Sequence, residues 1–173
     1  MPTFLAFDFE TADNGADSAC SIGLVRVEKG RITQEAVHLI RPPRERFLFT
    51  HIHGLRWHDC REAPTFGLLW PTIAPLFAGV DFVVAHNVSF DRRVLHACLE
   101  VHQLEHPQVE YRCSVQLARK AFGIHPTKLS NVCAVLGIEL QHHEALSDAR
   151  ACAQIVLRAH RLQETKQTAP AMV

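Results

Sequence analysis

The chain has 173 residues and a mass of 19.5 kDa, which fits one domain because domains usually contain about 100–200 residues. Its hydrophobic content of 47% and charged content of 21% are ordinary for a globular protein and exclude a disordered chain. Eighteen basic residues balance eighteen acidic ones, which excludes a histone-like protein that binds nucleic acid through bulk positive charge.

The first part of the chain predicts three antiparallel strands. A hydrophobic run over residues 3–9 predicts the first strand, because the turn signal Asp13-Asn14-Gly15 follows it. Residues 21–28 and 31–41 are rich in apolar residues and are joined by Lys29-Gly30, which predicts a hairpin. Two prolines then end the third strand, since proline cannot continue a central ladder.

The rest of the chain predicts alternating helices and strands. Helical spacing of apolar residues predicts a helix over 66–77, which Pro71 and Pro75 are expected to kink or break. The other expected elements are a buried strand at 82–85, a helix from Ser89 to about residue 104, a short strand at 110–113, short helices at 115–122 and 129–136, and a long helix at 145–162. This order predicts an α/β fold with a mixed five-stranded sheet, three antiparallel strands followed by parallel ones, flanked by helices. We expect one domain over residues 1–163 and a disordered tail over 164–173.

The ends of the chain and its cysteines indicate a cytoplasmic protein. The first ten residues hold two acids and no basic segment, unlike a signal peptide, and no apolar run is long enough to span a membrane. Because no such run is present, we expect no membrane contact. The six cysteines form no C-x-x-C pair, so we expect reduced thiols. Twelve histidines lack partners at the spacing of a structural zinc site.

Three acids lie where a sheet could bring them to a cleft. Asp8 and Glu10 are two residues apart on the first predicted strand, so both point to one face, either the solvated side of an edge strand or a cleft. Asp91 falls in the first turn of a predicted helix, where an acid is common without any function. However, that helix follows a buried strand, and open α/β sheets bind ligands at the carboxyl ends of such strands.

A fourth acid and a histidine add to this pattern. Asp148 stands at the beginning of the last predicted helix, where it is either a charge that stabilises the helix terminus or a side chain aimed at the cleft. His143 is either an exposed side chain without a role or a general base. Two unneutralised acids 4 Å apart would repel by about 4 kcal/mol at an effective dielectric constant of 20. Converging acids therefore predict divalent cations, and oxygen ligands favour Mg²⁺ or Mn²⁺ over zinc. Two such ions, about 3.5–4 Å apart, form the clamp used in phosphodiester hydrolysis.

Three motifs resemble those of the DEDD exonuclease superfamily, in its histidine-bearing branch. The first, D-x-E-T, occupies residues 8–11, the second, H-N-x-x-F-D, residues 86–91, and the third, H-x4-D, residues 143–148. They are similar to motifs of the epsilon proofreading subunit of bacterial DNA polymerase III, and residues 84–95 are especially similar to the exonuclease X type. The resemblance implies a ribonuclease H-like fold and two-metal hydrolysis from a 3′ end with release of nucleoside monophosphates.

The resemblance also implies roles for individual residues. His143 would take a proton from the attacking water, and for Phe90 a place in the core is the alternative to stacking on a base. The implied metal ligands are Asp8, Glu10, Asp91 and Asp148, and the implied substrate contacts are Thr11, His53, Asn87 and Phe90. Nearby basic residues either make a metal-loaded face more positive or form ordinary solvated surface; they are Arg92, Arg93, Arg119, Lys120 and Lys128.

Three functions remain open from the sequence. The first is a metal-dependent 3′→5′ exonuclease that acts mainly on DNA. The second is an exoribonuclease of the same fold, because no residue identifies itself as a reader of the 2′-hydroxyl group. The third is a non-catalytic nucleic-acid-binding domain, which the intact set of acids and base disfavours. The short tail shows no clamp-binding pattern, so we expect a stand-alone enzyme without a polymerase or clamp partner.

Overall fold

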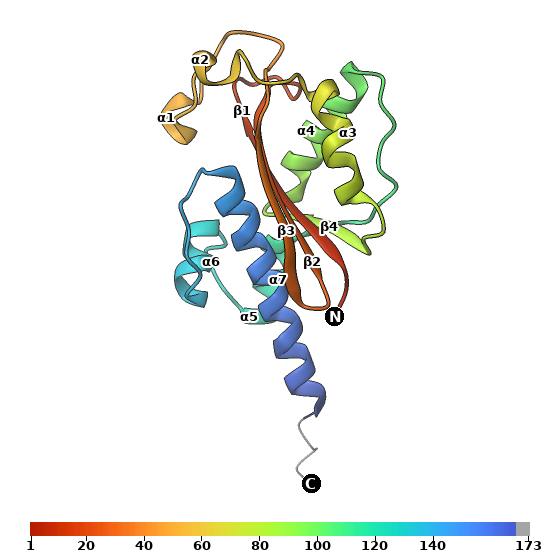
Figure 1. Ribbon diagram of the computed structural model, residues 1–173. Coiled ribbons are helices and arrows are strands. Elements are labelled where there is room, and N and C mark those ends of the chain that lie inside the picture. Colours follow the sequence, from red (N-terminus) through yellow and green to blue (C-terminus); the bar gives the residue numbers. More distant parts are fainter. Residues whose placement is uncertain (169–173) are drawn as a thin grey trace.

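The computed structural model describes residues 1–168, without the side chains of 166–168. Its centre is a five-stranded sheet of order β3-β2-β1-β4-β5 (Figure 1). The strands are β1 (Phe4–Thr11), β2 (Ala19–Glu28), β3 (Arg31–Leu39), β4 (Phe82–Ala85) and β5 (Tyr111–Cys113). β1 pairs antiparallel with β2 and parallel with β4, and β5 continues the parallel part. The predicted α/β architecture is confirmed.

Helices cover both faces of this sheet (Figure 1). They are α1 (Thr50–His53), α2 (Trp57–Cys60), α3 (Phe66–Phe77), α4 (Val88–Val101), α5 (Ser114–Phe122), α6 (Leu129–Leu136) and α7 (Ala145–Thr168). α3 and α4 bury their apolar sides against one face, and α7 packs on the other, where α5 and α6 join it. The sheet therefore lies between two hydrophobic cores, one on each face.

β1 is the central strand, and its alternation sends side chains into both cores. Phe7 and Phe9 pack into the cluster with α3 and α4, whereas Phe4 and Ala6 pack against α7. Full burial of each phenylalanine contributes about 1.5–3 kcal/mol to stability. Because the period of a strand is two, Asp8 and Glu10 follow Phe4 and Ala6 onto the α7 face. The edge-strand alternative for these acids is therefore excluded.

A glycine allows the start of α7 to approach that face. Gly23 pairs with Asp8 across the β1–β2 ladder, and a Cβ atom there would lie 2.1 Å from the carbonyl oxygen of Ala145. Any larger residue would push away the first turn of α7, which carries Asp148. The close packing of helix on strand is thus what brings an acid from the end of the chain to the acids of β1.

Several element boundaries differ from the predictions. α7 continues to Thr168, so residues 164–168 are helical rather than part of a disordered tail, and residues 169–173 lie outside the described residues. The expectation of a stand-alone enzyme rested on the absence of a clamp-binding pattern in that tail, and it stays a prediction. α3 runs unbroken through Pro71 and Pro75, both of which face solvent, where water can bond the carbonyl groups left without a donor.

The start of α4 also differs from the prediction. The helix begins at Val88 rather than at Ser89, and its N-cap is Asn87 in the left-handed region with φ 71°. The Ser89 hydroxyl donates to Asn87 Oδ1 at 3.2 Å. α1 and α2 have four residues each, too short for a periodic pattern, and were not predicted. In the part of the chain that the structure describes, no helix has the length and apolarity needed to cross a membrane.

Candidate active site

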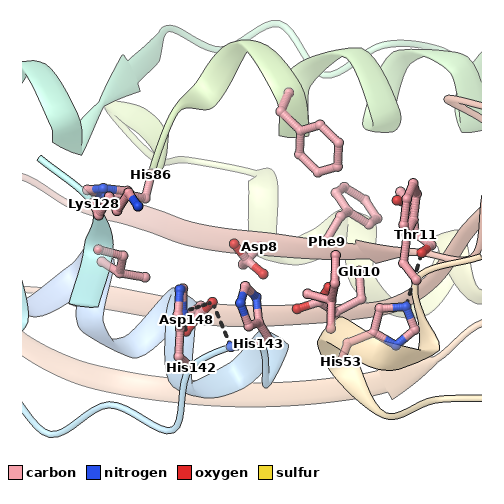
Figure 2. A pocket seen from close by; sticks show the side chains of 14 residues that line it. Asp8, Phe9, Glu10, Thr11, His53, His86, Lys128, His142, His143 and Asp148 are labelled. Atoms are coloured by element: carbon pink, nitrogen blue, oxygen red, sulfur yellow. Dashed lines mark hydrogen bonds and ion pairs between the residues drawn. The ribbon is translucent and has the colours of Figure 1, made fainter. Parts of the chain in front are cut away.

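Three of the four predicted acids meet in a cavity of about 460 Å³ at the carboxyl end of β1 (Figure 2). Asp8 and Glu10 come from β1, and Asp148 comes from the first turn of α7. Each offers a carboxylate oxygen, and these oxygens lie within 4.8 Å of one another. Among the described residues, no lysine or arginine forms an ion pair with any of the three.

The fourth acid, Asp91, lies behind the other three and does not line the cavity. It is 1% exposed, and its Oδ1 accepts a hydrogen bond from the backbone N–H of Phe9 at 3.0 Å. This bond ties α4 to β1 between Asp8 and Glu10. Asp91 is close enough to Asp8 and Glu10 to raise the pKa of both carboxyl groups.

Burial and mutual repulsion raise the pKa values of these carboxyl groups and so disfavour their ionised form in the absence of a cation. Burial, followed by the charges of the neighbouring acids, raises the pKa of Asp8 well above its ordinary value and that of Glu10 to about 8. Burial also raises the pKa of Asp91 to about 7, although two backbone N–H groups oppose the shift. The pKa of Asp148 is raised too, mainly by burial. Such a cluster is stable in the ionised form only with added positive charge.

His143 lies beside Asp148 in the loop before α7. Its backbone N–H donates to Asp148 Oδ2 at 3.3 Å, and its backbone is left-handed with φ 66°. The adjacent His142 places Nδ1 3.3 Å from the same oxygen, and the two imidazole rings stack at 3.8 Å. Burial and the neighbouring His142 lower the pKa of His143, so its ring is mainly neutral at pH 7 and can accept a proton.

The end of the cavity near α1 is formed by Thr11 and His53 (Figure 2), and Phe90 also lines the cavity. His53 Nε2 donates to the Thr11 carbonyl at 3.1 Å, while its Nδ1 accepts from the backbone N–H of Leu55. Because these two bonds assign opposite roles to the ring nitrogens, His53 is a neutral, fixed wall. Burial lowers its pKa in agreement with this. Phe90 presents its ring from α4.

The opposite end is formed by His86 and Lys128 (Figure 2). His86 Nε2 donates to the carbonyl oxygen of Thr127 at 2.8 Å, and its Nδ1 lies 2.8 Å from the buried hydroxyl of Ser114. Both ring nitrogens therefore have protein partners, and His86 anchors the loop before α6 to the end of β4. Burial lowers the pKa of His86.

The structure thus places seven of the nine predicted site residues around one cavity. They are Asp8, Glu10, Thr11, His53, Phe90, His143 and Asp148. Asp91 lies beneath the cavity floor, and the side chain of Asn87 is exposed at the start of α4, outside the lining. The sequence prediction missed His142 and His86, although both stand inside or beside the motifs. The lining by Phe49 was also missed, because nothing in the sequence marks it.

The donor set fits hard divalent cations. Three carboxylates that no described lysine or arginine neutralises are the ligands that Mg²⁺ and Mn²⁺ prefer. A second group, His142, His143 and Asp148, also lies within 4.8 Å, which is a donor set that zinc accepts. However, the two imidazole planes are stacked and only 21° apart, so their nitrogen lone pairs do not point to one ion. The all-oxygen group is the better metal site.

Comparison with known proteins identifies the family. The family model described as Exonuclease matches residues 5–156. The chain belongs to this exonuclease family. This confirms the resemblance to the DEDD exonuclease superfamily, and the matched region contains all three motifs.

Two relatives of known name are similar to most of this chain. The chain is 31% identical over 163 residues to the PolC-type DNA polymerase III of Thermotoga petrophila, which covers 90% of this chain and 12% of the polymerase. It is also 31% identical over 147 residues to exodeoxyribonuclease 10 of Escherichia coli (strain K12), which covers 79% of this chain and 59% of that enzyme. The chain therefore spans less than two thirds of either relative.

Solved structures agree with the fold. A complex of exonuclease X with 5′ overhanging duplex DNA superposes with a TM-score of 0.71 and 25% identity, covering 96% of this chain and 94% of that one. The nuclease domain of 3'hExo, a DEDDh family member bound to rAMP, has a TM-score of 0.79, with 92% of each chain covered. At 16% identity, the second similarity shows the fold alone.

Proposed function

We propose that this exonuclease-family chain hydrolyses phosphodiester bonds from DNA 3′ ends and releases nucleoside monophosphates by a two-metal mechanism. The observation that carries the proposal is the convergence of Asp8, Glu10 and Asp148 beside His143, without a lysine or arginine partner among the described residues. Buried acids without compensating charge lower the stability of the folded protein. Groups of this kind are found mainly at functional sites.

The residues divide the work by position. Asp8, Glu10 and Asp148, with Asp91 beneath them, would hold two Mg²⁺ or Mn²⁺ ions, which when bound supply positive charge to the attacking and leaving oxygens. The neutral ring of His143 accepts the proton of the attacking water. The walls at Thr11 and His53 receive the terminal nucleoside, and the ring of Phe90 offers a stacking surface for its base.

The comparisons favour DNA over RNA as the substrate. Both sequence relatives at 31% identity have names that refer to DNA, and exonuclease X is bound to duplex DNA. An exoribonuclease remains the second candidate because the chain shares its fold with 3'hExo, which is bound to rAMP, and with a 3'-exonuclease whose structure describes 3'-end specific recognition of a histone mRNA stem-loop. A non-catalytic domain is the least favoured, since the acids and the base are all present.

Matched oligonucleotides test the proposal. Single-stranded and duplex DNA and RNA of one sequence, labelled at either end, are incubated with the chain and Mg²⁺. We expect the 3′ label to leave first as a mononucleotide and the 5′-labelled DNA to shorten stepwise, faster than RNA. Release of the 5′ label first, or cleavage only at internal positions, would contradict the proposed polarity.

A further inference from the structure

Lys128 is the single lysine or arginine among the described residues that line the candidate active site. Its side chain is exposed, and its ammonium group forms no ion pair with any described carboxylate. It lies at the end of the cavity opposite Thr11 and His53, with the carboxylates between (Figure 2). An unpaired lysine at this end can contact the part of a bound ligand that extends past the carboxylates, away from Thr11 and His53.

The backbone that carries Lys128 is held firmly. The carbonyl oxygen of the preceding residue, Thr127, accepts from His86 at 2.8 Å, and the Thr127 hydroxyl accepts from Arg119 at 3.3 Å. The carbonyl oxygen of Lys128 itself accepts from the backbone N–H of Val132 in the first turn of α6. The backbone at Lys128 is therefore fixed before any ligand binds, so binding orders only the side chain and not the loop.

The arrangement gives a nucleic-acid strand a direction through the cavity. With the terminal nucleoside at Thr11 and His53, the scissile phosphate lies at the carboxylates, and the next phosphate lies beyond them. That next phosphate is an internal phosphodiester with one negative charge, and a lysine binds such a group as a point charge. The carboxylates would repel this phosphate, whereas a cation at that position would favour its binding.

We infer that Lys128 binds the phosphate that precedes the scissile phosphate on its 5′ side. This inference rests on the proposed function, because it needs a 3′ terminus in the cavity. Lys128 then acts as a substrate-binding residue that holds the strand in register with the carboxylates. The alternative is that Lys128 pairs with the site acids and never contacts the strand.

A chemical double-mutant cycle tests the inference. The Asp8→Ala variant is used so that the substrate stays intact, and it binds a single-stranded DNA oligonucleotide whose second linkage from the 3′ end is either phosphate or uncharged methylphosphonate. We expect the methylphosphonate to weaken binding severalfold when Lys128 is present and to have no further effect in Lys128→Ala. The slope of log affinity against log salt should fall in magnitude by about 0.7, the value for one contact with a single strand.

The matched control is Lys120→Ala on α5, because Lys120 is an exposed lysine that does not line this cavity. This variant should keep the full sensitivity to methylphosphonate, and Lys128→Arg should restore it. Equal sensitivity in Lys128→Ala and in the protein with Lys128, or an equal loss in both lysine variants, would overturn the inference.

The same oligonucleotides separate this inference from the proposed function. If the unmodified chain with Mg²⁺ removes 3′ nucleotides but the cycle shows no coupling to Lys128, the inference is wrong and the function stands. If the cycle shows coupling but the chain never hydrolyses the 3′ end, the function is wrong and the phosphate contact stands. Melting curves of each lysine variant confirm that the compared proteins are folded.

Discussion

Two cavities of similar volume contain glutamates in opposite electrostatic states. The candidate active site measures about 460 Å³ and holds Glu10, whose pKa is raised to about 8 by burial and neighbouring acids. The second cavity, about 410 Å³ between β5, α5 and α7, holds Glu110, whose pKa is lowered by its hydrogen bonds to Arg112 at 2.9 and 3.0 Å. Volume does not distinguish them, but uncompensated charge does. An acid without a partner marks the cavity that requires a cation.

The largest effect should come from removing a carboxylate of the first cavity. Asp8→Ala should lower the rate of hydrolysis roughly a thousandfold or more, because metal ions contribute several kcal/mol to the transition state and each 1.36 kcal/mol is tenfold in rate. Glu110→Ala, in the second cavity, should change the rate less than about twofold. The measurement is release of a 3′ label, and equal rates in the two variants would contradict the distinction between the cavities.

Removal of divalent cations should have a similarly large effect on activity. Hydrolysis should disappear in EDTA and return with added Mg²⁺ or Mn²⁺, because no described lysine or arginine pairs with the three carboxylates and could replace the metal. Calorimetry of the metal-free protein should detect binding that Glu10→Gln weakens and Glu110→Gln leaves unchanged. Activity that persists at full strength in EDTA would disprove the metal requirement.

A smaller effect should separate the two neighbouring histidines. His143→Ala should lower the rate about 10²–10⁴-fold, the usual contribution of a general base, while metal and DNA binding remain. His142→Ala should cost less, since His142 only contacts Asp148 at 3.3 Å and also lies over the His143 ring. Rates and metal affinities of the two variants test this order, and a larger loss for His142→Ala would assign the base to the other ring.

The smallest effect concerns stability and pH. Because the pKa of Glu10 is higher in the folded state than in an unfolded chain, the folded state binds the proton more tightly, and the stability present at low pH is lost as pH rises toward about 8. The free energy of unfolding of the metal-free protein should therefore decline between about pH 5 and pH 8, and less so for Glu10→Gln. Urea denaturation in EDTA measures this. Glu110→Gln should not flatten the decline, and a decline equally steep in Glu10→Gln would contradict the raised pKa.

Much of the fold and part of the site could be predicted from local patterns. Strand alternation places Asp8 and Glu10 on one face with Phe7 and Phe9 on the other, and both arrangements are confirmed. Periodicity found the strands and longer helices, because apolar side chains repeat at the period of each element. It failed at Pro71 and Pro75 and at the four-residue helices, where tertiary packing or brevity outweighs local pattern.

The sequence by itself determined which residue types were available to the site and, through three motifs, the family to which the chain belongs. Only the tertiary structure decided how they meet. Gly23 admits the first turn of α7 and so brings Asp148 to Asp8, while the bond from Phe9 draws Asp91 below the floor. These contacts join residues far apart in the chain. The close packing of helices on the sheet determines these contacts, and no local sequence pattern predicts them.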